Sequence, residues 1–545
     1  MWWHLLLAPC AAAILALGLP AERLSAAEPL HQAIDRLIAA QAAGEVGPLA
    51  GDAEFLRRAY LDLAGKIPAA DEARAFLADP ATDKRAKLID RLLESPDFPR
   101  RMQDLFHAML LERRGDDPHW LDYLRRSFEA NKPWDVLARE ILDPDPQDEA
   151  VRGAAYFYVS RLDKVGQQDT DYPGLTRDVG RLFLGVDLQC AQCHNHLFID
   201  DYKQQDFQGL YAVFLNTFIR RDVKFPAVGE NLLTKKTEFM SVFDKVPLAT
   251  GPRIPGGAEI EIPAFAAGEE YRVPPDKQAN QPGEPKFSPL EAIAARVATA
   301  ENAAFSRNIA NRLWFVMFGR GLVHPLDLFH RENPPSHPEL LELLAQDIAA
   351  RKFDMRGMLR ELALSETYQR SGLLPAAGEA PPPASYRVAL EKPLSAEQLF
   401  WSMLTAAGTP AAAPPGNEQP GDEKAGKTEL DELRKRFVAA FANPPKEPEI
   451  EFSPSVKAAL FVMNDPRVLG LLEARPGNLV DRLSELAGPR EVADELYLSV
   501  LTRLPTDEER ADMAAALAER PDRRAAVLGQ MAWALVASTE FCLNH

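Results

Sequence analysis

The chain has 545 residues, of which 46% are hydrophobic and 26% are charged. This is the balance of a folded globular protein, and it excludes the collagen-like, coiled-coil and wholly disordered classes. The 80 acidic and 62 basic side chains give a net charge of −18, which argues against a general affinity for nucleic acids or anionic lipids. The length predicts about three domains, or fewer larger ones.

Residues 1–27 have the pattern of an export signal. Residues 2–19 are apolar, and residues 25–27 are the small side chains that a signal peptidase requires before its cleavage point. No Lys or Arg precedes the apolar stretch, and an uncleaved N-terminal anchor is the alternative. We expect cleavage after Ala27, a periplasmic or secreted location, and no membrane span in the mature chain.

Helical periodicity dominates the remaining sequence. Leu30, Ile34, Leu37 and Ile38 have the spacing of one apolar helix face. Two serines are expected to begin helices in capping boxes, because a Glu or Gln follows each serine three residues later. These pairs are Ser336 with Glu339 and Ser395 with Gln398. A further helix carries Arg307, Asn311 and Arg312, which we expect to be buried and to hold the loop that follows.

Two regions interrupt the helical pattern. Residues 220–290 are dense in Pro and Gly, and Ile alternates with Glu over residues 259–262, which predicts a small irregular β insertion. Residues 406–427 are rich in Ala, Pro and Gly and are typical of a linker. We therefore predict a mainly α protein with two packed α-helical domains, 28–219 and 291–545, joined through the insertion.

The residues Cys190-Ala191-Gln192-Cys193-His194 form a C-x-x-C-H motif. This spacing allows two thiols to add to the two vinyl groups of one haem while the adjacent His binds the iron. Covalent attachment of haem takes place outside the cytoplasm, in agreement with the export signal. The motif predicts haem c, with Cys190 and Cys193 as the anchors and His194 as the proximal ligand of the haem iron.

Two other interpretations of the motif remain open. Because His196 follows closely, the side chains of Cys190, Cys193, His194 and His196 could together bind zinc or iron, although the adjacency of Cys193 and His194 crowds such a site. The cysteines could instead form a structural disulfide or a redox pair whose thiol pKa the His adjusts. A thioredoxin-like site would need a βαβ context, and that pattern is missing.

The sequence does not identify a sixth iron ligand, and a five-coordinate iron is equally allowed. The candidates are Met240, His107, His119, His324 and His330. An aromatic-rich helix face follows the motif, and it is either a haem wall or ordinary core. Its residues are Phe207, Leu210, Tyr211 and Phe214.

The chain resembles the planctomycete-type secreted cytochrome-like proteins, which are built from two tandem domains of unknown function. The first domain's pattern lies in residues 55–68, 88–98 and 183–196. The second domain's pattern lies in residues 308–323 and 332–341 and ends at residues 540–545. The resemblance implies a cytochrome-like cysteine motif and no particular activity. Where relatives typically have Asp between the two histidines of the motif, this chain has Asn195, which removes a charge.

These observations lead to two expectations about function. The first is an exported c-type haem protein that serves periplasmic electron transfer or redox chemistry with an unidentified redox partner. The alternative is a metal-binding or structural extracellular protein that uses the same cysteines and histidines. The sequence has no G-x-S-x-G, P-loop, G-x-G-x-x-G or H-E-x-x-H pattern, so it predicts no enzyme class.

Overall fold

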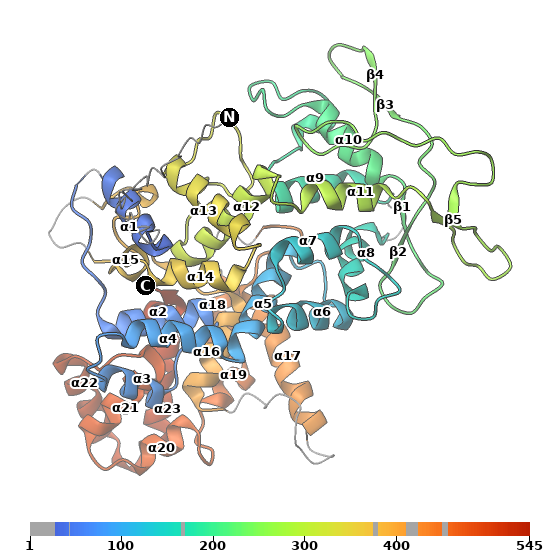
Figure 1. Cartoon of the computed structure of the whole chain (residues 1–545). Coiled ribbons are helices and arrows are strands. Elements are labelled where there is room, and N and C mark those ends of the chain that lie inside the picture. Colours follow the sequence, from blue (N-terminus) through green and yellow to red (C-terminus); the bar gives the residue numbers. More distant parts are fainter. Residues whose placement is uncertain (1–27, 43, 165–168, 374–379, 410–422, 449–455) are drawn as a thin grey trace, which may run out of the picture.

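The computed structural model describes residues 28–42, 44–164, 169–373, 380–409, 423–448 and 456–545 (Figure 1). The predicted export signal at residues 1–27 lies outside these ranges. Within them, none of the helices has the length and apolar character needed to cross a bilayer.

The described residues form 24 α-helices and only small two-stranded sheets, which confirms the mainly α prediction. Before the insertion the helices are α1 (Leu30–Gln41), α2 (Asp52–Leu63), α3 (Ala70–Ala78), α4 (Lys84–Glu94), α5 (Asp97–Leu111), α6 (Pro118–Glu129), α7 (Trp134–Leu142), η1 (Arg152–Ala155), α8 (Tyr156–Leu162), α9 (Tyr172–Leu184), η2 (Cys190–Gln192) and α10 (Gln204–Phe214).

After the insertion the chain is again helical. The elements are α11 (Pro289–Val297), α12 (Ala303–Phe318), α13 (Pro338–Ala350), α14 (Met355–Leu364), α15 (Glu366–Gln369), η3 (Pro383–Ser385), α16 (Ala396–Ala407), α17 (Glu423–Phe441), α18 (Val456–Asn464), α19 (Pro466–Leu471), α20 (Leu479–Glu485), α21 (Pro489–Leu501), α22 (Asp507–Glu519), η4 (Pro521–Arg523), α23 (Arg524–Val536) and α24 (Thr539–Cys542). Residues 410–422 of the predicted linker lie outside the described residues, and α17 begins directly after them.

One of the two predicted capping boxes is confirmed and the other is wrong. At the start of α16 the N–H of Gln398 donates to the Ser395 hydroxyl (3.2 Å), and the N–H of Ser395 donates to Gln398 Oε1 (3.0 Å). Helix α13 instead begins one residue later than predicted, with Pro338 in its first turn and His337 at the N-cap. Ser336 does not cap this helix, because it lies one residue before the N-cap and no side chain accepts a capping hydrogen bond there. Its N–H donates to the Leu322 carbonyl (2.8 Å).

The insertion consists of short antiparallel pairs, which confirms the predicted small irregular β structure. The pairs are β1 (Thr217–Ile219) with β2 (Val228–Glu230), β3 (Thr237–Met240) with β4 (Pro247–Thr250), and β5 (Tyr271–Val273) with β6 (Glu284–Pro285). The alternating residues 259–262 lie in no strand. The N–H of Ile260 donates to the Pro252 carbonyl (2.7 Å), and the Ile260 side chain is buried. Burial within a loop, and not pairing between strands, therefore accounts for the apolar residue at this position.

A carboxyl in this insertion opposes folding when it ionises. Glu230 accepts hydrogen bonds from the Ser288 hydroxyl (2.5 Å) and from the N–H of Leu290 (3.0 Å). Burial nevertheless raises the pKa of Glu230 to about 7, with a smaller contribution from Asp143. Because the folded-state pKa exceeds the unfolded value, the stabilisation is complete below the unfolded pKa of about 4.3 and is lost as the pH rises through 7.

We therefore expect this group to lower the free energy of unfolding by about 1–3 kcal/mol between about pH 5 and about pH 8. The Glu230→Gln variant should remove that part of the pH dependence, and urea unfolding across this range measures it. Glu269→Gln, at an exposed position of the same insertion, is the matched control. Parallel pH profiles for the wild type and Glu230→Gln would contradict the assignment.

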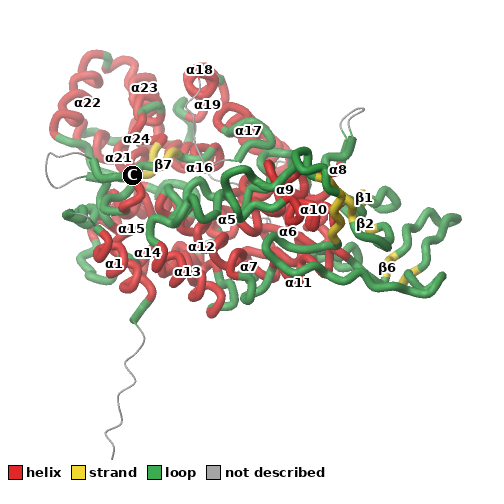
Figure 2. The backbone as a smooth tube through the Cα atoms, turned by 90° about the horizontal axis from the view of Figure 1, so that it is seen from above, coloured by secondary structure: helices red, strands yellow, loops and turns green. Residues whose placement is uncertain are grey.

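The buried side chains group into two hydrophobic cores. The first core runs from Leu30 to Tyr386 and includes Leu498, and the second runs from Leu394 to Phe541 and includes Leu61 and Ile67. The boundary between the cores therefore falls before α16 rather than at the insertion. Figures 1 and 2 show the strands of the insertion at one end of the molecule and helices α21 to α23 at the opposite end.

The end of the chain returns to helix α2 and joins the two cores. Strand β8 (Leu543–Asn544) pairs with β7 (Lys392–Pro393). Asp62, which is buried in α2, accepts hydrogen bonds from Lys392 Nζ (2.6 Å), Asn544 Nδ2 (2.8 Å) and the Tyr368 hydroxyl (2.9 Å). One carboxylate thus connects three segments that are distant in sequence.

Candidate functional site

The C-x-x-C-H motif occupies a short turn after helix α9. Helix α9 ends at Leu184. The next residue, Gly185, adopts a left-handed φ of 72°, and the N–H of Val186 donates back to the Gly180 carbonyl (3.1 Å). The chain then forms the 3₁₀ turn η2. Such a turn has three residues per repeat, so the side chains of residues 190 and 193 lie on one side of it. Both thiols are free and exposed.

The ring of His194 is oriented as a metal ligand would be. Its Nδ1 lies 2.6 Å from the Asn195 carbonyl oxygen. A carbonyl can only accept, so Nδ1 carries the proton and the neutral ring keeps the lone pair of Nε2 for a ligand. The ring also contacts Phe243, with ring centroids 4.7 Å apart.

His196 has the opposite arrangement. Its Nδ1 faces the N–H groups of Ile199 (2.9 Å) and Phe198 (3.2 Å), which makes it an acceptor and places the proton of the neutral ring on Nε2. Across the described part of the chain, no three His, Cys, Asp or Glu side chains form a group that could hold a metal ion. Cys190, Cys193, His194 and His196 are therefore not gathered around one point.

Of the candidate sixth ligands, the structure brings Met240 toward the motif. The N–H of Val242 donates to the Cys193 carbonyl (3.2 Å), which places the β3–β4 hairpin against the turn. Gln204 joins the two segments, because its N–H donates to Asn195 Oδ1 (2.9 Å) and its amide donates to the Met240 carbonyl (3.3 Å).

Three of the four histidines named as sixth-ligand candidates have other surroundings. The buried His107 of α5 bonds to Asp116 (2.9 Å) and to the Trp120 indole N–H (3.1 Å). His119 lies in the first turn of α6, and His324 lies in the loop after α12. His330 is the exception, because it packs on Tyr202 with ring centroids 5.5 Å apart, and the same ring packs on His196 at 6.1 Å.

The aromatic face of α10 is core rather than an open haem wall. Phe207, Leu210 and Phe214 are buried in the first core, and Tyr211 is partly buried against it. A different apolar surface, which the sequence does not predict, lies beside the motif, and we call it the motif patch. Its side chains are all at least half exposed, and they lie in the loop after the motif and in or beside the β3–β4 hairpin: Leu197, Phe198, Met240, Val242, Phe243, Val246 and Leu248.

No periodic pattern marks the motif patch in the sequence, because its members come from a loop and a hairpin. Its composition was the available signal, since a large apolar residue in an irregular segment has no helix face to join. Single exposed apolar residues are normal, whereas a group of them beside reactive side chains marks a binding surface.

Two family models of unknown function match this chain in tandem. Residues 33–218 match the family model PSCyt2, a protein of unknown function (DUF1549). Residues 291–517 match the family model PSD1, a protein of unknown function (DUF1553). Comparisons with curated proteins and with solved structures gave no significant match.

Proposed function

We propose that this chain is an exported c-type haem protein with a role in periplasmic electron transfer or redox chemistry. In this proposal each thiol of Cys190 and Cys193 adds its S–H across one vinyl group of the porphyrin, and His194 binds the iron through Nε2. The observation that carries the proposal is the pair of exposed free thiols on one side of a single turn, followed directly by a His with Nε2 available. Haem would supply one-electron chemistry at this position.

The motif patch supports the same proposal. Seven large apolar side chains are exposed around the motif in a chain with a net charge of −18. Covering such a surface with a flat apolar group is favourable, at about 25 cal/mol for each Å² removed from water. The name of the first matched family model, PSCyt2, agrees with the resemblance to planctomycete-type cytochrome-like proteins.

The alternative is a metal-binding or structural extracellular protein that uses the same residues. A zinc or iron site made of Cys190, Cys193, His194 and His196 is less well supported, because His196 Nδ1 faces two N–H groups. A haem requires only one His from the motif and does not need His196 to turn. A disulfide between the two cysteines would not explain why the apolar side chains of the motif patch are exposed.

The test is to express the full chain with residues 1–27 in a host that attaches haem to C-x-x-C-H motifs in its periplasm. We expect a Soret band and a pyridine haemochrome, and colour that remains with the protein after acid–acetone extraction. Cys190→Ala and Cys193→Ala should each lower covalently bound haem severalfold. Cys542→Ala, at the partly buried free cysteine of α24, should leave the haem content unchanged.

A colourless export product with two reactive thiols would refute haem attachment. Stoichiometric zinc or iron without a Soret band would favour the metal-binding alternative. Loss of both free thiols without colour would favour the disulfide. Covalent haem in Cys193→Ala at the wild-type level would show that this cysteine is not an anchor.

A further inference from the structure

The β3–β4 hairpin is tied to the C-x-x-C-H motif through its main chain. The N–H of Val242 donates to the Cys193 carbonyl (3.2 Å). Gln204 forms a second bridge, because its N–H donates to Asn195 Oδ1 (2.9 Å) and its side-chain amide donates to the Met240 carbonyl (3.3 Å). Two separate sets of hydrogen bonds therefore hold the start of the hairpin turn beside the motif.

The turn itself is fixed by Ser241. The Ser241 side chain is buried, and its hydroxyl accepts a hydrogen bond from the N–H of Phe243 (3.2 Å). The N–H of Lys245 donates to the Ser241 carbonyl (3.1 Å). Met240 is the last residue of β3 and lies opposite Pro247 of β4. The backbone of Met240 is thus held both by the pairing of the strands and by the bridges to the motif.

The side chain of Met240, in contrast, is not packed into either core. It is 52% exposed, while Phe239 before it is half-buried and Ser241 after it is buried. Successive side chains of a strand point to opposite faces, so Met240 lies on the exposed face of the hairpin. Its thioether is carried on an unbranched chain with three rotatable bonds, and it can therefore turn toward a ligand without a change in the backbone.

His330 is the other candidate ligand near the motif, because it packs on the same Tyr202 ring as His196. A His that binds a metal usually donates its second ring N–H to an acceptor, as His194 does to the Asn195 carbonyl. His330 Nδ1 is buried and has no hydrogen-bond partner among the described residues. Binding iron through Nε2 would leave a buried N–H without an acceptor, which costs free energy. A thioether carries no proton and has no such cost.

We propose that Met240 is the second axial ligand of the haem iron, opposite His194. The inference rests on the proposed function and deepens it, because two protein ligands leave no open position on the iron and favour electron transfer over ligand or peroxide chemistry. The Met240 sulfur binds through a lone pair, so no bond breaks and no proton is released. Val242 and Phe243, which are exposed on the same hairpin, exclude water from that side of the iron.

The test compares the wild type with Met240→Leu after export with haem attached. Leu keeps the size and apolar character of a side chain that is already half exposed, so we expect normal folding. The ferric wild type should show the weak far-red charge-transfer band of an iron–thioether bond. The ferrous wild type should show a Met methyl resonance shifted upfield of the other protein signals. Met240→Leu should lose both signals and change from a low-spin to a high-spin spectrum.

Imidazole binding measures the same bond quantitatively. Added imidazole has to displace the Met240 sulfur in the wild type, whereas it meets an open iron in Met240→Leu. If the sulfur is bound in about nine of ten molecules, imidazole should bind to Met240→Leu about tenfold more tightly. The reduction potential of the variant should fall, because Met ligation raises it.

Met463→Leu is the matched control. Met463 is also 52% exposed, but it lies in α18, where Phe461 packs on the second core. This substitution should leave the spectra, the imidazole affinity and the reduction potential unchanged. His330→Ala should keep both thioether signals.

A wild type that carries covalent haem without the thioether signals would overturn the inference and leave haem attachment intact. An unchanged spectrum in Met240→Leu would also overturn it, as would a low-spin spectrum that depends on His330 instead. A wild type without covalent haem would refute the proposed function and this inference together. The pyridine haemochrome distinguishes the two failures, because it measures covalent haem whatever its axial ligands are.

Discussion

Replacing Asp62 with Asn is expected to lower the free energy of unfolding by about 3–5 kcal/mol. Asn has nearly the same shape as Asp and can keep hydrogen bonds with the side chains of Tyr368 and Asn544. It cannot balance the charge of Lys392, whose ammonium is held by the Asp62 carboxylate (2.6 Å) and by the Met317 carbonyl (2.8 Å). The loss is large because the remaining ammonium stays buried without a counter-ion.

A double-mutant cycle separates this charge effect from a general loss of packing. Lys392→Met alone should destabilise the protein by a similar amount, because it leaves the Asp62 carboxylate unpaired. The double variant Asp62→Asn, Lys392→Met should be more stable than the sum of the single losses predicts. Unfolding in guanidinium chloride, followed by tryptophan fluorescence and far-UV circular dichroism, measures all four proteins.

The matched control for this cycle is an ion pair at the surface. Asp90→Asn breaks the pair with Arg360 (2.6 Å), and both side chains are about two-fifths exposed. We expect it to change the free energy of unfolding by no more than about 1 kcal/mol. A loss of that small size in Asp62→Asn would show that water reaches Lys392 and that the carboxylate does not join the two cores.

The sequence predicts features that depend on near neighbours. The capping box at Ser395 is formed by residues three apart, so its pattern is sufficient. The prediction of buried residues that hold the following loop is confirmed for two of its three residues, because Asn311 Nδ2 donates to the Val323 carbonyl (2.8 Å) and Arg312 pairs with Asp327. These contacts span at most fifteen residues. The prediction is wrong for Arg307, which is partly exposed and pairs with Glu342 of α13.

The sequence does not predict what depends on distant segments. The hydrogen bond between Asp62 and Asn544 joins residues 482 positions apart, and no local pattern indicates it. The division of the buried side chains into two cores has the same origin, because the helices that form each core meet only after folding. The failed cap at Ser336 is a smaller case, since its N–H pairs with Leu322 across a loop.

The motif lies between these two extremes. The spacing of Cys190, Cys193 and His194 predicts the ligand set, and the structure adds the orientation of the His194 and His196 rings. That orientation depends on backbone groups of the next few residues, which the motif pattern does not encode. The motif patch depends on the β3–β4 hairpin some 40 residues further along, and no pattern in the motif indicates that contact.

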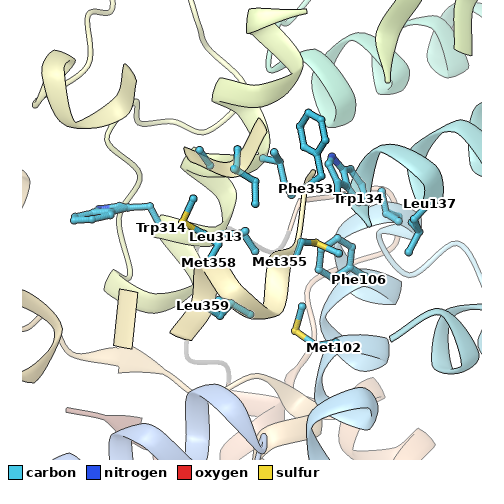
Figure 3. Close-up of a cluster of buried hydrophobic side chains, with 14 of the residues drawn as sticks. Met102, Phe106, Trp134, Leu137, Leu313, Trp314, Phe353, Met355, Met358 and Leu359 are labelled. Carbon is cyan, nitrogen blue, oxygen red and sulfur yellow. The ribbon is translucent and has the colours of Figure 1, made fainter. Parts of the chain in front are cut away.

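Trp134→Ala is expected to cost about 3–5 kcal/mol, the range for removing a large aromatic side chain from a core. Trp134 is 1% exposed and stacks on Phe183 and Phe305, with ring centroids 5.9 Å and 6.1 Å away. Figure 3 shows it beside Phe106 and Phe353 in the first core. Trp134→Phe should lose less, because a smaller ring still fills part of the space. Urea unfolding of both variants measures the difference.

The position of this ring also tests whether the two family-matched regions fold as one unit. Phe183 belongs to the first region and Phe305 belongs to the second, so the substitution removes a side chain that both regions contact. If they share the first core, Trp134→Ala shifts a single transition that is the same by fluorescence and by circular dichroism. A shift confined to one of two transitions would show separate folding. Phe198→Ala, at a position 85% exposed, should change stability by less than about 0.5 kcal/mol and provides the baseline for this comparison.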